Sequence, residues 1–101
     1  MNIEKAITLC RELEAIVRPF GWHVGLTGGC LYKDGDRKDV DVIVYPHDPA
    51  KRPNRSRMID AVSRAIGVDD FVDGPFEPSC ANKDIVVLKG EHCRVDLFIL
   101  S

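Results

Sequence analysis

Hydrophobic positions near the start of the chain recur at intervals of three and four residues. This repeat predicts an amphipathic helix over residues 3–18. Asn2 is a suitable N-cap, and the helix should end at Arg18, because the proline that follows disfavours helical backbone in the residue before it. We expect the apolar stripe to pack on the protein's own sheet. It consists of Ile3, Ala6, Ile7, Cys10, Leu13 and Val17.

Several further segments are rich in apolar and β-branched residues, which indicates strands. The best defined is Asp-Val-Asp-Val-Ile-Val-Tyr at 39–45, closed by Pro46. Segments 85–89 and 94–100 flank Gly90 and predict a hairpin. Other strands are expected at 22–27, which runs into Gly28-Gly29, and at Phe71-Val72, a short edge strand before the breaker Gly74-Pro75.

Helical periodicity returns at residues 55–66, and Gly67 suits the position just after a helix end. The expected order is therefore helix, strand, strand, helix and hairpin. This order predicts an α+β domain with a mixed sheet of about four to five strands and helices packed on one face. At 101 residues, the chain (1–101) corresponds to a single domain.

The charge balance limits the classes of partner. Lys and Arg number 14 against 16 Asp and Glu, which gives a net charge of -2. This excludes a broadly basic protein that coats a polyanion, so any contact with phosphates has to come from a local patch. The sequence contains one cluster of basic residues, which either binds phosphate groups or belongs to a solvated loop and helix start. Its members are Lys51, Arg52, Arg55 and Arg57.

The lack of an export signal in the sequence predicts that the four cysteines are in a reducing compartment. No run approaches the roughly 20 apolar residues of a membrane span, and the first residues lack the segments of a signal peptide. We therefore expect a cytoplasmic protein with reduced thiols and no membrane contact. Zinc held by Cys80, His92 and Cys93 is an alternative that strand geometry disfavours, because adjacent residues point to opposite faces.

The acidic residues are unevenly divided, with eleven Asp against five Glu. Most of these aspartates fit turns and caps, but Asp39 and Asp41 lie on a predicted strand. Strand alternation places both carboxylates on one face, about 6.6–7 Å apart along the backbone. Two like charges on one face repel each other unless a cation or a basic group lies between them.

A third aspartate, Asp96, lies inside the apolar strand Arg-Val-Asp-Leu-Phe-Ile-Leu. An unpaired carboxylate buried there would cost several kcal/mol, so something must compensate its charge. A metal ion shared with Asp39 and Asp41 would do so. The alternatives are that Asp96 lies on an exposed face, or that it pairs with Arg94 or a lysine.

The glycine turn at Gly28-Gly29 adds a possible phosphate contact. Two glycines let the backbone approach a phosphate closely, and successive N–H groups at a helix start bind anions. Glycine pairs alone are mostly turns. Combined with an Asp-x-Asp strand and a later strand carrying one central Asp, the turn fits a divalent cation that holds a nucleoside triphosphate.

These motifs resemble the signature of the DNA polymerase β-like nucleotidyltransferases. The matching residues are Gly28-Gly29-Cys30, Asp39-Val40-Asp41 and Val95-Asp96-Leu97. The resemblance covers nearly the whole chain, because the predicted element order is similar to the family's minimal core. It implies a nucleotidyltransferase-like fold and Mg²⁺-dependent transfer of a nucleoside monophosphate from an NTP such as ATP to a hydroxyl, with release of pyrophosphate.

Carried over to this chain, the resemblance assigns the three aspartates to catalysis and metal binding. Asp39 and Asp41 would ligate two Mg²⁺ ions, for which Mn²⁺ could substitute, and Asp96 would hold one of them and accept the proton of the attacking hydroxyl. Gly28 and Gly29 would place N–H groups on the triphosphate. Cys30 stands where many members have Ser, and Lys38 precedes the Asp-x-Asp pair, where it could neutralise phosphate charge.

The resemblance leaves the acceptor open between a protein hydroxyl, a nucleic-acid end and a small molecule. Many members carry a C-terminal helical region that helps to hold base or acceptor, whereas this sequence stops at Ser101, directly after the third-aspartate strand. We therefore expect a partner protein, a second copy of the chain or the open sheet face to supply the acceptor site. The competing hypothesis is a catalytically inactive module of the same fold that binds nucleotide, nucleic acid or a protein.

Overall fold

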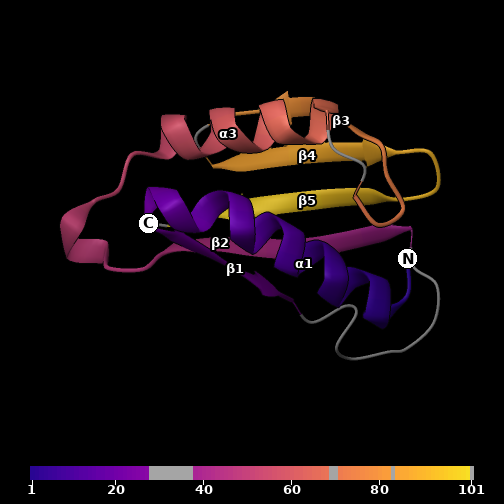
Figure 1. Cartoon of the computed structure of the whole chain (residues 1–101), viewed down its shortest axis with the longest axis horizontal. Coiled ribbons are helices and arrows are strands. Elements are labelled where there is room, and N and C mark those ends of the chain that lie inside the picture. Colours follow the sequence, from indigo (N-terminus) through magenta and orange to yellow (C-terminus); the bar gives the residue numbers. More distant parts are fainter. Residues whose placement is uncertain (28–37, 69–70, 83, 101) are drawn as a thin grey trace.

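The computed structural model describes residues 1–27, 38–68, 71–82 and 84–100, which form a five-stranded mixed sheet with two α-helices on one face (Figure 1). Short 3-10 turns occur at Arg18–Phe20 and Pro49–Lys51. Among the described helices, none is long and apolar enough to cross a membrane. In chain order the elements are α1 (Ile3–Val17), β1 (Trp22–Leu26), β2 (Asp39–Pro46), α3 (Arg55–Val68), β3 (Phe76–Ala81), β4 (Ile85–Gly90) and β5 (Arg94–Ile99).

The strand order in the sheet is β1-β2-β5-β4-β3. The central pair, β2 and β5, is parallel, and the other three pairs are antiparallel. Because β2 and β5 run in the same direction, the first residues of the two strands lie next to each other. The predicted α+β fold with helices on one face is therefore confirmed.

The core lies between the helices and the inner face of the sheet. Burial alternates along β2, where Val40, Val42 and Val44 are buried while Asp39 and Asp41 are exposed. The helices cover the valine face, and the aspartates lie on the opposite, open face. The helices contribute Ala6, Leu9, Leu13, Val17, Met58, Val62 and Ile66 to the core.

Both predicted helices are present, with two corrections. Asn2 caps α1 as predicted, because its side-chain oxygen accepts a hydrogen bond from the Lys5 N–H at 2.9 Å. The buried stripe of α1 includes Leu9, whereas Ile7 is exposed. The second helix continues through Gly67 to Val68, so Gly67 does not follow the helix end. A Cβ at Gly67 would meet no atom within 4 Å, which shows that it lies on the outer surface of α3.

The edge strand was predicted in the wrong place. Phe71-Val72 precedes a turn in which the Gly74 N–H bonds the Phe71 carbonyl at 2.7 Å, and the strand is Phe76–Ala81. Phe71 is buried in the hydrophobic core without being part of a strand. β3 contains Pro78, which is tolerated because β3 is at the sheet edge, and its register shifts between Pro78 and Cys80.

Candidate functional site

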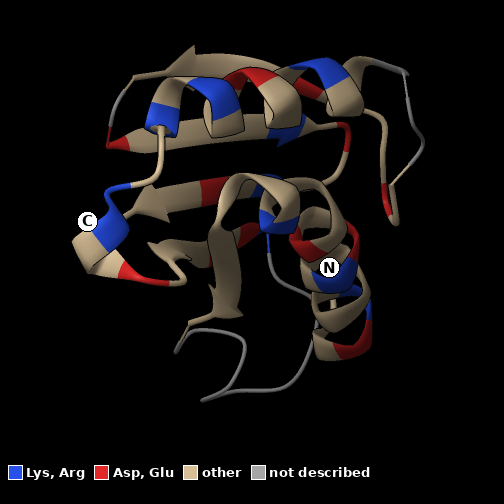
Figure 2. Ribbon diagram, turned by 60° about the vertical axis from the view of Figure 1, so that its left-hand side comes forward, with Lys and Arg blue, Asp and Glu red and all other residues tan. Residues whose placement is uncertain are grey.

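Three aspartates share the open face of the sheet, and we call Asp39, Asp41 and Asp96 the acid row. Asp41 and Asp96 are register partners on the parallel strands β2 and β5, and Asp39 lies two residues before Asp41. Register partners in adjacent strands point to the same side of a sheet. The acidic segments of these two neighbouring strands lie close together in Figure 2. The fold thus gathers onto one surface the three carboxylates that the sequence analysis singled out.

Asp96 is the buried member of the acid row. It is only 7% exposed, and it lies between Asp41 on β2 and Val87 on β4. Its Oδ2 accepts a hydrogen bond from Arg94 Nη2 at 3.1 Å, whereas its Oδ1 is buried and has no hydrogen-bond partner among the described residues. An unpartnered buried carboxylate oxygen is unfavourable, so this atom is a position where a cation or a proton donor would be stabilising.

Arg94 is the cation that contacts the acid row in this structure. Besides Asp96, it approaches Asp39, with 3.7 Å between Arg94 Nε and Asp39 Oδ1. This pairing agrees with the sequence alternative in which Arg94 compensates Asp96. Within the described ranges, no three His, Cys, Asp or Glu side chains are grouped so that they could hold a metal ion as they stand.

The chemistry of the acid row nevertheless fits a divalent cation. Carboxylate oxygens are the ligands that Mg²⁺ prefers, and Asp96 Oδ1 lacks a partner among the described residues. Arg94 is about half exposed, with 48% of its side chain accessible, so its guanidinium can turn away toward solvent. A cation at the row would then replace the arginine as the compensating charge.

Thr27 and Lys38, the described residues on either side of positions 28–37, lie at the acid row. Thr27 donates from its backbone N–H and from Oγ1 to the Asp41 carbonyl oxygen, at 3.1 and 2.7 Å. Lys38 is exposed, and its carbonyl accepts from the Arg94 N–H at 2.7 Å. The Thr27 hydroxyl is therefore occupied by a structural bond at this end of β1. The predicted phosphate-contacting residues Gly28, Gly29 and Cys30 lie outside the described residues.

A second polar cluster, which the sequence analysis did not find, joins Glu14, His23 and His47. His23 Nδ1 is 2.8 Å from Glu14 Oε2, and His23 Nε2 is 2.8 Å from His47 Nδ1. A carboxylate can only accept, so Nδ1 of His23 carries the proton in this contact. The pairing of β1 with β2 sets His23 opposite Tyr45 and brings His47 near, and spacing along the chain gives no signal for this arrangement.

Glu14 is the anchor of this cluster. Partial burial raises the pKa of its carboxyl, but hydrogen bonds from His23, the Val24 N–H and Arg18 outweigh that effect, so the pKa lies below its ordinary value of 4.5. A carboxyl whose pKa is lowered by folding stabilises the native state above its unfolded pKa, and this contribution is lost as the pH falls through the native value.

We therefore expect Glu14→Gln to lower the free energy of unfolding at pH 7 by about 1–2 kcal/mol, since charge-assisted hydrogen bonds are lost. The difference between wild type and variant should shrink as the pH falls below about 4.5, the ordinary pKa of the carboxyl in the unfolded chain, and through the lower pKa of the native carboxyl. Urea unfolding of both proteins at several pH values between 7 and 3 measures this. A difference that stays constant over the whole range would contradict the assignment.

The three residues considered as zinc ligands lie in different environments. Cys80 is exposed on β3, and His92 is exposed in the turn before β5. Cys93 is buried, and this burial raises the pKa of its thiol. Cys93 therefore belongs to the core rather than to a surface site.

Comparison with known proteins adds no family assignment to this geometry. The sequence matches no protein-family model, and no curated protein matches it. The functional interpretation of the acid row therefore rests on the residues and their arrangement.

Proposed function

We propose that this protein is a Mg²⁺-dependent nucleotidyltransferase that moves a nucleoside monophosphate from an NTP to a hydroxyl acceptor. The observation that carries the proposal is the direct pairing of Asp41 with Asp96 on parallel strands, with Asp39 on the same face. The unpartnered oxygen of Asp96 supports it, because a buried carboxylate at such a position needs a compensating charge.

In the proposed site, Asp39, Asp41 and Asp96 hold the divalent cations, either two Mg²⁺ or Mn²⁺. When bound, such ions neutralise phosphate charge and stabilise the attacking and leaving oxygens. Asp96 is on a central strand, which fixes its carboxylate, and it takes the proton of the attacking hydroxyl. Lys38, beside Asp39, would contact the triphosphate. The resemblance also assigns triphosphate contacts to Gly28, Gly29 and Cys30, which lie outside the described residues.

The acceptor oxygen forms a bond to the α-phosphorus, the bond from that phosphorus to the bridging oxygen of the β-phosphate breaks, and pyrophosphate leaves. The hydroxyl proton passes to the Asp96 carboxylate. Positioning and charge neutralisation supply most of the rate, and strands of a packed sheet provide rigid positions for both.

Three classes of acceptor are proposed: a protein hydroxyl, a nucleic-acid end or a small molecule. The open sheet face, a second copy of the chain or a partner protein would seat it. Beyond the acid row, the open face carries the exposed aromatic side chains Tyr45 and Phe98, which offer apolar surface for such contact. We place the activity in the cytoplasm, where NTPs and Mg²⁺ are abundant.

The second candidate function is an inactive nucleotidyltransferase-like module that binds nucleotide, nucleic acid or protein. The contacts of Arg94 with Asp96 and Asp39 favour it, because they compensate the acid row without any metal. In this case Arg94 is a permanent structural cation. The two candidates differ in whether the row releases Arg94 when metal and nucleotide are supplied.

The test of the proposed function is incubation with each α-labelled NTP and Mg²⁺ or Mn²⁺. The acceptors offered are the protein itself, an RNA with a free 3′ hydroxyl and a small polyol. Pyrophosphate release with transfer of label to one acceptor supports transfer. Nucleotide binding without pyrophosphate release under all conditions supports the inactive module and contradicts catalysis.

A further inference from the structure

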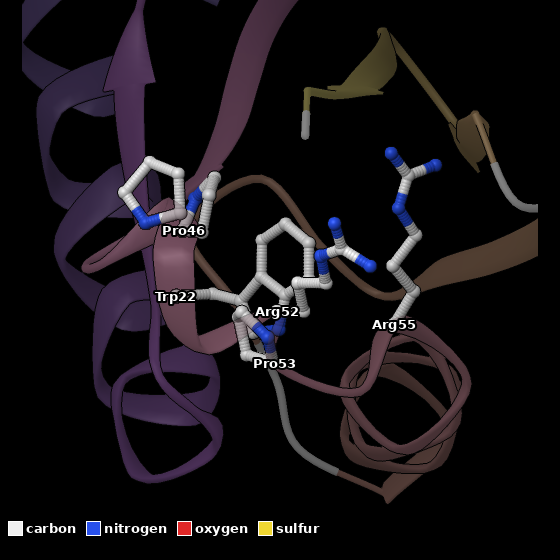
Figure 3. Close-up of a pocket in the computed structure, with 6 residues that line it drawn as sticks. Trp22, Pro46, Arg52, Pro53 and Arg55 are labelled. Atoms are coloured by element: carbon white, nitrogen blue, oxygen red, sulfur yellow. The ribbon is translucent and has the colours of Figure 1, made fainter.

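A cavity of about 500 Å³ lies at the opposite end of β2 from the acid row (Figure 3). Along the strand, Pro46 is five residues beyond Asp41, which corresponds to about 17 Å at the rise of an antiparallel strand. Pro46 is also buried, like the valines of the helix-covered face. The cavity is therefore separate from the proposed catalytic surface. It is lined by Trp22, Pro46, Pro49, Arg52, Pro53 and Arg55.

The floor of this cavity is apolar and rigid. Trp22 is only 1% exposed, and it is the register partner of Pro46 across β1 and β2. Proline rings have fixed backbone φ angles, so the three prolines in the wall lose little further freedom when a ligand binds. A hydrogen bond of 2.8 Å from the His47 N–H to the Gly21 carbonyl joins the residue after β2 to the residue before β1. The cavity is thus preformed rather than made by a mobile side chain.

Two arginines supply the charge of this cavity. Arg52 follows the 3-10 turn with φ 46, a left-handed conformation that is uncommon for a residue with a side chain. Arg55 begins α3, and its Nη1 contacts Asp84 Oδ1 at 3.2 Å. Both guanidinium groups extend toward the same side of the cavity in Figure 3. Arg52 forms no ion pair within the part of the chain that the structure describes.

The basic cluster of the sequence analysis lies at this cavity. Lys51, Arg52, Arg55 and Arg57 gather around the N-terminus of α3, where the helix dipole is also positive. Like charges at this position repel each other and the dipole, and a bound anion would relieve both interactions. Guanidinium groups bind phosphate through paired N–H donors, and a cavity of this volume is within the usual range for small-molecule sites.

We infer that this cavity binds a phosphorylated small molecule with a planar ring, of the mononucleotide class. The phosphate contacts Arg52 and Arg55, and the ring lies against the prolines of the wall, next to the buried indole of Trp22, since an apolar wall suits a flat ring. This inference does not rest on the proposed transferase activity. A nucleic-acid strand is the competing ligand, because its phosphates would also bind a basic cluster.

The test uses the single tryptophan of the chain as a reporter, with AMP as the probe. We expect AMP to change Trp22 fluorescence saturably, and adenosine and inorganic phosphate to bind more weakly than AMP. Arg52→Gln should weaken AMP binding about tenfold, as for loss of one charge-assisted contact. Arg57→Gln removes the same charge from the same cluster outside the cavity lining, and we expect less than about a twofold effect. Asp41→Asn should leave AMP binding unchanged.

Four outcomes would overturn the inference. The first is the absence of saturable AMP binding at millimolar concentration. The second is equal weakening by Arg52→Gln and Arg57→Gln, which indicates diffuse attraction. The third is loss of binding in Asp41→Asn, which places the nucleotide at the acid row. The fourth is a single-stranded oligonucleotide binding more tightly than AMP with dependence on Arg57, which assigns the cluster to nucleic acid. Arg52 and Arg57 are exposed, so circular dichroism should confirm that both variants fold.

Discussion

Replacing Asp41 with Asn is expected to reduce nucleotidyl transfer about 1000-fold without changing the fold. In the proposed site the carboxylate is a metal ligand whose charge stabilisation would be worth several kcal/mol, and about 4 kcal/mol corresponds to three powers of ten in rate. The side chain of Asp41 is exposed, and the bonds that tie Thr27 to this residue use its backbone carbonyl, which Asn retains. Folding should therefore be preserved while the metal ligand is lost.

Pyrophosphate release under saturating Mg²⁺ and NTP measures this effect. Asp60→Asn is the matched control, since Asp60 is an exposed carboxylate on α3 paired with Arg64, away from the open face of the sheet. The control should keep wild-type activity. If Asp41→Asn releases pyrophosphate at a rate within threefold of wild type, the acid row is not the catalytic site.

Replacing Arg94 with Gln is expected to make the stability of the protein depend on Mg²⁺. The variant removes the cation that donates to Asp96 Oδ2, while Asp96 Oδ1 already has no partner among the described residues. Breaking a fully buried pair costs about 3–5 kcal/mol, but Arg94 is half exposed, so we expect about 2 kcal/mol in the presence of a chelator. Added Mg²⁺ should restore part of this loss, because a bound cation stabilises the native state by mass action.

Urea unfolding with and without Mg²⁺ measures the free energy of unfolding for this comparison. Arg64→Gln is the matched control, since Arg64 forms an exposed i,i+4 pair with Asp60 on α3. Such a pair contributes about 0.5 kcal/mol or less, with no metal dependence. An Arg94→Gln variant that behaves like this control would show that Arg94 does not compensate Asp96.

Local sequence patterns predicted the acid row because they determine which face a residue occupies. The alternation of valine and aspartate in 39–45 is a property of one strand, and it placed Asp39 and Asp41 on the exposed face. The register of β2 against β5 depends on how two distant segments pair, so the direct opposition of Asp41 and Asp96 could be expected only from the resemblance to a family. In the structure, Asp41 and Asp96 are direct register partners.

The errors and omissions also have physical causes. Phe71 is a core residue outside any strand, and β3 carries a proline that an edge strand tolerates. The contact between His23 and His47 required the register of β1 against β2, and Glu14 is on a different element, so spacing along the chain carried no signal for it. The assignments to Gly28, Gly29 and Cys30 stay predictions.

The most direct measurement of the central claim is paramagnetic broadening of backbone amide signals by Mn²⁺, with a non-hydrolysable NTP analogue present. Broadening falls steeply with the distance between the ion and each amide, so the most broadened signals identify where the ion binds. We predict that the amides of Asp41 and Asp96 broaden first, that those of α3 on the opposite face broaden least, and that Asp41→Asn removes the effect. Broadening centred on His23 and His47, or unchanged by Asp41→Asn, would contradict a metal-nucleotide site at the acid row.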